Sequence, residues 1–317
     1  MRITSFVAGI LIWFLAASLA AAAPFKPGNI VVANSPFGDE DLFEYTPAGT
    51  LVQSINVAPA DNGRDLLVDR IGRVQLYNGT FNPVLTQYDP VSGSFSSRSF
   101  AGWSTVNNLT YGGLATSGRY IFASDMATSG GEPKGVVRFD LDGGATVRFA
   151  TTLEPIDLTV GLDGLLYTLT TGSAFNGGGN RIDVFNPDSM AFVRTFSLPD
   201  ENRGISVGAN GHIYTAEDSP VSRVNHYDPS GVRLDFINDP GVGGFADIDI
   251  NDSGGLLIAS HGGVLLITDV NLDSIRSFPT RSSNLYSFAA WVPEPGAAML
   301  LVTTTLFLRR RRRSADW

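Results

Sequence analysis

The sequence predicts an all-β fold, a six-bladed β-propeller whose blades each contain four strands. A glycine followed by a short β-rich run recurs at nearly constant spacing along the chain. The six copies begin at Gly28, Gly72, Gly118, Gly164, Gly211 and Gly255, which are separated by 44, 46, 46, 47 and 44 residues. The first repeat lacks a leading strand and a spare strand follows the sixth, as in a ring that its last strand closes.

Each repeat contains the same four segments. The leading strands read RDLLVDR (64–70), LTYGGLA (109–115), DLTVGLD (157–163), GISVGAN (204–210) and DIDINDS (247–253). After the glycine strand comes an aromatic residue followed by a turn, as in QYDPVSG (87–93). Asp-Pro pairs favour a type I turn in which the aspartate accepts hydrogen bonds from nearby backbone amides. A final strand such as FVRTFSL (192–198) completes the four.

The ends of the repeat region decide how the ring closes. Residues 23–27 are few and contain two prolines, so they cannot supply the missing strand of blade one. The spare segment NLYSFAAWV (284–292) can. We predict that Leu285–Trp291 joins blade one, so that both free sheet edges are paired. The alternatives, an open solenoid or a sandwich, would not explain why one strand is missing at the start and one is spare at the end.

The repeats across residues 28–291 resemble the NHL and related six-bladed families, including the gluconolactonase-like group. The resemblance lies in the "x-D-I-x-V-D-x-x-G-x-I-Y" pattern and implies architecture, because such propellers host unrelated functions. The gluconolactonase-like enzymes use a Glu, an Asn and an Asp around a divalent ion in the channel. That motif does not occur in this sequence, where Glu154 is the one glutamate placed before an inner strand.

Residues 1–23 have the features of a secretory signal peptide. Arg2 is followed by an apolar stretch, Phe6–Leu15, and then by small residues through Ala23. We place cleavage by signal peptidase near Ala22–Ala23, because the next residue is a proline. The alternative is an N-terminal anchor that is not removed. Either reading predicts export across the inner membrane, with residues 24–291 forming the folded domain.

Residues 292–317 contain three features in order. The motif Val292, Pro293, Glu294, Pro295 comes first, the uncharged run Gly296–Leu308 second, and the cluster Arg309, Arg310, Arg311, Arg312, Arg313 third. At about 1.5 Å per residue, the 13-residue run forms a helix of roughly 20 Å, which is short of the roughly 30 Å hydrocarbon core. The arginines stay on the cytoplasmic side by the positive-inside rule.

This tail resembles the PEP-CTERM sorting signal of Gram-negative bacteria. The resemblance implies that an exosortase, a membrane cysteine protease, recognises and cleaves the tail. Until cleavage, the apolar helix would anchor the protein transiently in the membrane. The protein would afterwards be delivered to the cell surface or the extracellular space. The motif residues would serve recognition and not catalysis.

Composition excludes several classes of function. The chain has no cysteine, which excludes disulfides, cysteine nucleophiles and thiolate metal sites. Of the 22 basic residues, six are Arg2 and the five terminal arginines, whereas Asp316 is the one acidic residue beyond position 294. Residues 24–294 therefore carry 16 basic and 30 acidic residues. Such a surface repels phosphate backbones, so nucleic acid is not an expected partner.

Three aspartates are candidate metal ligands. Asp65, Asp157 and Asp247 precede the innermost strands of blades two, four and six, at matching repeat positions. Carboxylates that converge on the axis could hold Ca²⁺. The alternative is that each carboxylate binds backbone amides near the start of its strand. A metal-dependent hydrolase or lactonase is the function that the first reading implies.

The remaining residues that could take part in catalysis or bind a metal form no recognisable motif. The three histidines, His212, His226 and His261, show no H-x-H or H-x-x-x-H spacing, so the sequence does not predict a zinc or copper site. The glycine-rich run NGGGN (176–180) matches neither G-x-G-x-x-G nor a P-loop. The long loops 126–135 and 176–180 are the expected binding surface. The favoured function is an exported, non-enzymatic propeller that binds extracellular polysaccharide or a surface protein.

Overall fold

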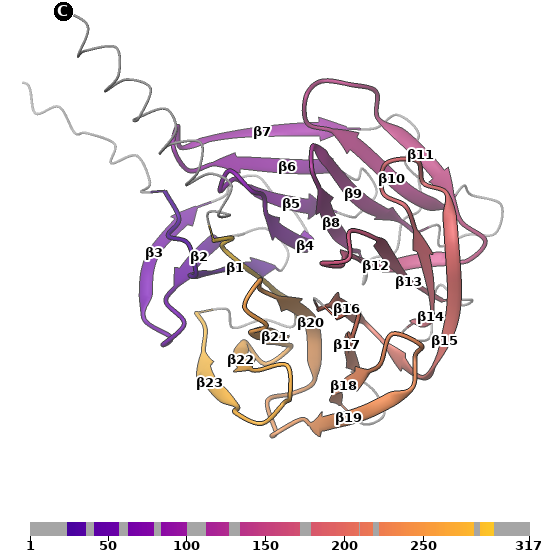
Figure 1. The fold of residues 1–317 in the computed structure, drawn as a ribbon. Helices are drawn as coiled ribbons and strands as arrows, with labels where there is room; N and C mark the ends of the chain where they lie inside the picture. The colour runs from indigo at the N-terminus through magenta and orange to yellow at the C-terminus, as the bar shows by residue number, and fades with distance from the viewer. Residues whose placement is uncertain are drawn as a thin grey trace, which may run out of the picture.

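The strands form six separate four-stranded antiparallel sheets arranged around a common axis (Figure 1). The computed structural model describes residues 24–35, 41–56, 63–78, 84–99, 112–126, 134–171, 179–208, 210–217, 222–281 and 286–294. The arrangement confirms the predicted all-β, six-bladed propeller with four strands in each blade. The predicted signal peptide, Pro295, the apolar run and the arginine cluster lie outside the described residues.

The first three blades contain twelve of the described strands. Blade one consists of β24 (Tyr286–Trp291), β1 (Ile30–Ser35), β2 (Asp41–Tyr45) and β3 (Leu51–Asn56). Blade two consists of β4 (Gly63–Val68), β5 (Val74–Asn78), β6 (Val84–Asp89) and β7 (Ser94–Ser99). Blade three consists of β8 (Leu114–Ser117), β9 (Tyr120–Asp125), β10 (Gly135–Asp140) and β11 (Val147–Ala150).

The other three blades follow in chain order around the ring. Blade four consists of β12 (Glu154–Val160), β13 (Leu166–Thr171), β14 (Gly179–Phe185) and β15 (Phe192–Asn202). Blade five consists of β16 (Gly204–Val207), β17 (Ile213–Glu217), β18 (Arg223–Tyr227) and β19 (Arg233–Asn238). Blade six consists of β20 (Phe245–Ile250), β21 (Leu256–Ser260), β22 (Val264–Thr268) and β23 (Arg276–Pro279).

Blade one is built from both ends of the described chain. The last strand, β24, pairs antiparallel with β1 from Ile30 opposite Trp291 to Ser35 opposite Tyr286. The ladder continues one residue further, because the Val292 amide donates to the Asn29 carbonyl at 2.8 Å. Val292 is only 4% exposed. The pairing of β24 with β1 therefore extends one residue beyond Trp291.

The start of the fold is also anchored by packing rather than by a strand. Phe25 is buried, and its ring meets the ring of Tyr88 in blade two edge to face, with centroids 6.2 Å apart. The Lys26 amide donates to the buried carboxylate of Glu44 at 2.8 Å. The first described residues thus hold the chain across the boundary between blades one and two.

The repeat glycine is required by the turn between the first two strands of a blade. Gly72, Gly164 and Gly211 have φ angles of 81°, 79° and 70°, a region that residues with a Cβ rarely adopt. In blade six the left-handed position is Gly254, with φ 83°, one residue before the glycine that the sequence pattern picks out. The amide of this glycine closes the turn onto the carbonyl of Asn251 at 2.9 Å.

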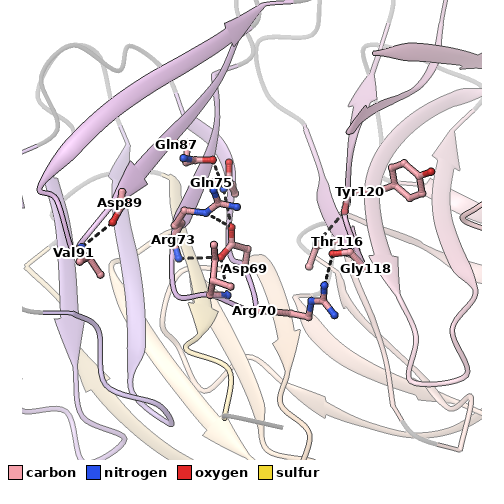
Figure 2. A network of polar contacts seen from close by, with 11 residues as sticks. Asp69, Arg70, Arg73, Gln75, Gln87, Asp89, Val91, Thr116, Gly118 and Tyr120 are labelled. Carbon is pink, nitrogen blue, oxygen red and sulfur yellow. Dashed lines mark hydrogen bonds and ion pairs between the residues drawn. The ribbon is translucent and has the colours of Figure 1, made fainter. Parts of the chain in front are cut away.

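In blade two an aspartate organises this turn (Figure 2). One carboxylate oxygen of Asp69 accepts the amides of Ile71 and Arg73, both at 3.0 Å. The other accepts the side chains of Arg73 at 2.8 Å and Gln75 at 3.2 Å. The neighbouring side chain, Arg70, donates to the Gly118 carbonyl in the equivalent turn of blade three at 3.0 Å. The turn is therefore tied internally and to the next blade.

The turn between the third and fourth strands has the predicted Asx bonds. Asp89 accepts the amide of Val91 at 2.8 Å, and Asp228 accepts those of Ser230 and Val232 at 2.8 and 2.9 Å. Left-handed residues close this turn in every blade, and they are Gly49, Gly93, Gly143, Met190, Gly231 and Leu272. In blades four and six the protein keeps a left-handed residue with a side chain, because Met190 and Leu272 are both buried in the core.

The core is divided among the interfaces between successive blades. Six clusters of buried apolar side chains each join two adjacent blades, the last joining blade six to blade one. The aromatic residue before the second turn belongs to these clusters: Tyr45, Tyr88, Phe139 and Tyr227 are all buried. Each blade is therefore stabilised by its two neighbours.

One predicted strand begins later than expected. The sequence places the leading strand of blade three at 109–115, but β8 begins at Leu114. Gly112 and Gly113 precede it as non-strand residues, and a Cβ at Gly113 would lie 2.4 Å from a carboxylate oxygen of Asp157 in the next blade. The start of β8 thus coincides with a contact between blades three and four. The pattern of apolar residues along the sequence could not predict such a contact.

Removal of the closing strand should unfold the propeller. A chain that lacks residues 286–292 loses the ladder on β1 and the buried side chains of Phe288, Trp291 and Val292. At about 1.5–3 kcal/mol for each large side chain, this loss is comparable with the roughly 5–15 kcal/mol that stabilises a domain. Circular dichroism melts and size-exclusion chromatography should show an unfolded or aggregated chain.

The matched control ends at Glu294. It retains every described contact of the closing strand and should melt cooperatively at the temperature of the parent. A chain without residues 286–292 that stays monomeric and melts like the parent would show that the ring does not depend on this strand.

Candidate functional site: an acidic axial channel

A cavity of about 220 Å³ lies on the axis of the ring. The innermost strand of every blade contributes to its wall, and these strands are β4, β8, β12, β16, β20 and β24. Asp65, Asp157 and Asp247 lie near the end at which the inner strands start, and Val68, Val160 and Ile250 lie near the other end. The cavity is small, and six carboxylates lie among the apolar side chains that line it.

The three predicted aspartates lie within the inner strands and not before them. In each case the pairing with the second strand of the blade shifts by one residue, between Gly63 and Asp65, between Pro155 and Asp157, and between Phe245 and Asp247. A bulge of this kind turns the following side chain away from the regular pleat. The bulge thus places the aspartates in the cavity wall, and the sequence-based position before the strand is corrected.

Each aspartate binds its own backbone with one oxygen. The Oδ1 atoms of Asp65, Asp157 and Asp247 accept the amide of the next residue at 2.6, 2.8 and 2.7 Å. All three side chains are buried. This contact holds the carboxylate in one orientation, so that the second oxygen points toward the neighbouring blade.

The second oxygen joins two blades. The Oδ2 atom of Asp65 accepts the Leu114 amide of blade three at 2.5 Å. That of Asp157 accepts the Ile205 amide of blade five at 2.7 Å. That of Asp247 accepts the Ala289 amide of blade one at 3.3 Å. The aspartates of the even blades therefore bind the inner strands of the odd blades, in a pattern that repeats three times around the ring.

A further carboxylate strengthens the junction at which the ring closes. Asp249, two residues after Asp247 on β20, accepts the amide of Trp291 at 2.9 Å and that of Ile250 at 2.8 Å. Asp247 and Asp249 together bind two backbone amides of β24. Blade six thus holds the strand that completes blade one, and it does so through charged acceptors, which make the strongest hydrogen bonds to amides.

The close packing of these carboxylates shifts their ionisation. Burial first, and then the charges of Asp247 and Asp157, raise the pKa of Asp65 well above its ordinary value. Burial and the charge of Asp247 do the same to the pKa of Asp157. Burial, followed by the charge of Asp249, raises the pKa of Asp247 to about 7, and burial raises that of Asp249 to about 6. Amide hydrogen bonds oppose the shift in every case.

The carboxylates that were predicted to bind calcium accept hydrogen bonds from backbone amides. Within the described ranges, no group of three or more His, Cys, Asp or Glu side chains is placed to hold a metal ion. Asp65, Asp157 and Asp247 use both oxygens on backbone amides, which is the alternative that the sequence left open. Glu154, the other acidic candidate, is the first residue of β12 and forms an ion pair with Lys134 at 2.9 Å.

The described part of the predicted sorting motif lies beside the channel. Val292, Pro293 and Glu294 follow directly on β24, and all three contribute to the cavity wall. A Cβ at Gly28 would lie 2.8 Å from a carboxylate oxygen of Glu294, so this exposed glutamate lies against the first turn of the fold. Among the described residues no helix is long and apolar enough to cross a membrane.

Two histidines that the sequence did not connect lie in contact. The Nδ1 atom of His212 and the Nε2 atom of His226 are 2.7 Å apart in blade five. His261 lies elsewhere, with its Nε2 atom 3.4 Å from the Arg203 guanidinium. Sequence spacing detects ligand pairs that lie on the same strand or helix. The contact of His212 with His226 instead depends on the pairing of β17 with β18. The predicted binding loops, 126–135 and 176–180, lie mostly outside the described residues.

Comparison with known proteins shows the fold. No protein-family model matches this chain, and no curated protein matches its sequence. A chain of the nidogen/laminin complex is 14% identical with a TM-score of 0.62, over 84% of this chain and 99% of that one. The WD40 domain of Neurospora crassa Pan2 is 11% identical with a TM-score of 0.52, over 87% and 80%. Streptogramin B lyase is 13% identical with a TM-score of 0.53, over 81% and 84%.

The channel aspartates should make stability depend on pH near neutrality. Their pKa values are raised in the folded state, so the fold binds extra protons and is more stable in acid. That contribution is complete below about pH 4 and is lost as the pH rises through the folded pKa values of about 6 for Asp249 and about 7 for Asp247. The melting temperature should fall by a few degrees between pH 5 and pH 8.

Asp247→Asn should flatten this dependence, because it removes one titrating group and its repulsion of Asp65 and Asp157. Asp228→Asn is the control, since hydrogen bonds from Ser230 and Val232 lower the pKa of Asp228 and confine its effect to acid. Differential scanning calorimetry across this range measures both. Equal slopes in the parent and Asp247→Asn would contradict the account.

Proposed function

We propose that this protein is an exported β-propeller that acts as a binding module at the cell surface or outside the cell, and that it is sorted by an exosortase-type system. The observation that carries the proposal is the use of the channel carboxylates. Asp65, Asp157 and Asp247 each bind their own strand with one oxygen and the neighbouring blade with the other, so the acidic chemistry at the axis serves the scaffold. A rigid ring of this kind presents binding surfaces on loops that differ between blades.

The structural comparisons support the binding half of the proposal. A chain of the nidogen/laminin complex, a protein–protein assembly, has the same fold as this protein over most of both chains. Streptogramin B lyase shares the fold too, so the fold alone does not separate binding from catalysis. We infer a protein or a polysaccharide of the envelope or extracellular matrix as the partner, reached through the strand connections at one end of the ring.

The sequence of the two ends supports the sorting half. The described fold starts with Phe25 packed on blade two, directly after the cleavage site that we place near Ala23. It ends with Val292 bound to β1, so that the predicted recognition motif begins where the propeller stops.

Sorting can be tested with the terminal arginines. Exchange of Arg309–Arg313 for glutamine should stop recognition of the tail, so that the protein remains in the membrane fraction with its C-terminus intact. The parent should be recovered from the surface or the medium with a mass that lacks the apolar run. Intact-mass spectrometry after cell fractionation measures both in the native host.

Arg276→Gln with Arg281→Gln is the matched control, because these exposed arginines lie on the propeller itself. It should be sorted like the parent. A parent protein that retains its full C-terminus in every fraction would contradict the sorting half and leave the binding half untouched.

Calcium distinguishes the binding module from the alternative, a metal-dependent hydrolase or lactonase. A ligand at 100 times its dissociation constant stabilises a fold by about 2.7 kcal/mol, which is a readily measured shift in melting temperature. A binding module whose aspartates serve the scaffold should show no shift on addition of millimolar Ca²⁺ or Mn²⁺ to chelator-treated protein. A shift in the parent that disappears in Asp157→Asn would favour the hydrolase.

A further inference from the structure

One end of the ring, called here the turn end, contains two sets of turns. The strands of each blade are antiparallel, so the turn between the first two strands and the turn between the last two lie at the same end. The two sets meet in blade three, where the Leu141 amide donates to the Arg119 carbonyl at 2.9 Å. The connections between second and third strands, which include the predicted binding loops, join the strands at the opposite end.

The C-terminal end of the described chain leaves the fold at the turn end. Strand β24 runs toward it, and the Gly28 amide donates to the carbonyl of the last buried residue, Val292, at 3.0 Å. Pro293 and Glu294 continue from there in the wall of the axial cavity, which the turn of blade six at Asp252 also lines. The chain beyond Glu294 therefore starts beside the axis of the ring and not at its outer edge.

Exposed apolar side chains gather at the same end. Eleven large apolar side chains are exposed among the described residues, and all but Phe236 lie in one of these turns or no further than the second residue of the outer strand that follows. We call this set the apolar rim. Every blade contributes to it, and one member from each blade in chain order is Val52, Ile71, Val147, Leu162, Val232 and Ile275. Single exposed apolar residues are ordinary, whereas a set that recurs in six blades at one end indicates an interaction surface.

The most exposed members of the apolar rim stand on turns whose backbone is held in place. Val91 is 71% exposed and Ile71 is 63% exposed. The Val91 amide donates to Asp89 at 2.8 Å and the Ile71 amide donates to Asp69 at 3.0 Å. Leu162, also exposed, occupies the turn of blade four that corresponds to that of Ile71. These side chains can be buried against a partner without the cost of ordering a loop.

The chain between the fold and the apolar run limits how the ring can face a membrane. Pro293, Glu294 and Pro295 separate Val292 from the run Gly296–Leu308. The four peptide steps from Val292 to Gly296 span at most about 14 Å. Four strands about 4.8 Å apart already cover about 14 Å from the innermost strand of a blade to its outermost. The connection is too short to pass around a blade, so the turn end is the side that faces a membrane holding the run.

We propose that the turn end of the propeller rests on the membrane that holds the tail, and that the apolar rim enters the interfacial layer of the lipid. The inference rests on the proposed anchoring of the tail. Burial of apolar side chains drives the contact, and the partner is the lipid surface itself. The strand connections at the opposite end, which include loops 126–135 and 176–180, then point away from the membrane, where a partner of the proposed binding module can reach them.

Polarity-sensitive labels test the contact, because the chain has no cysteine of its own. The full chain is reconstituted into phosphatidylcholine vesicles with the dye NBD on Ile71→Cys, Leu162→Cys or Val91→Cys. Each label should shift its emission to shorter wavelength and be quenched by lipids with spin-labelled acyl chains. Labels on Asn56→Cys and Asn238→Cys should keep the emission of a label in water, because these exposed residues end β3 and β19 at the opposite end of the ring.

Removal of apolar side chains gives a second measurement. Ile71→Ser combined with Leu162→Ser should leave the fold intact, because both side chains are exposed, and should reduce the emission shift of the label on Val91→Cys. Phe236→Ser is the matched control, since this exposed side chain lies outside the apolar rim, and it should leave the shift unchanged.

The inference is overturned if protein with an inserted tail shows water-like emission at all three rim positions. It is also overturned if the labels at the opposite end shift instead, or if the double serine variant behaves like Phe236→Ser. A chain that does not insert into the vesicles contradicts the anchoring and the inference together. A tail that inserts but is never cut in the native host contradicts the proposed sorting and leaves this inference standing.

Discussion

The propeller depends on hydrogen bonds that backbone amides donate to carboxylates of the neighbouring blade, close to the axis. Among the described residues, the buried apolar clusters join neighbouring blades, so each blade is stabilised through its junctions with the next. Asp65, Asp157 and Asp247 each join two blades in this way beside the axial cavity. A charged acceptor binds an amide more strongly than a neutral one does, and buried amides need a partner.

This arrangement has an electrostatic cost that the protein offsets only in part. Three carboxylates share a small, buried space and repel one another, which raises their pKa values. The amides that they accept act in the opposite direction. The result is a scaffold whose stability depends on the protonation of its own channel. The same acidic residues that resemble a metal site in sequence are therefore explained by the assembly of the ring.

Several features of the fold could be predicted because they are local. The turn glycines need a left-handed backbone, the Asx residues bind amides two residues away, and the aromatic residues recur at a fixed distance from both. These requirements act within a few residues, so they appear as a period of roughly 45 residues. Counting the strand segments in each repeat also shows that the first repeat lacks one strand and that one strand follows the last repeat. In the structure this last strand, β24, pairs with β1.

The candidate sites were less predictable, because they depend on contacts between strands. The bulges that turn Asp65, Asp157 and Asp247 into the cavity wall have no signature in composition. The left-handed residue of blade six is Gly254 and not Gly255, a difference of one residue that only the hydrogen bonds of the turn reveal. His212 and His226 are 14 positions apart and show no ligand spacing, yet strand pairing brings their nitrogens to 2.7 Å.

The sequence by itself determined the number of blades and the four strands in each. It did so because turn chemistry and repeat length are properties of short segments. Only the tertiary structure decided what the polar residues do. A carboxylate or an imidazole acquires its role from the atoms that face it, and in this ring those atoms come from another strand or another blade.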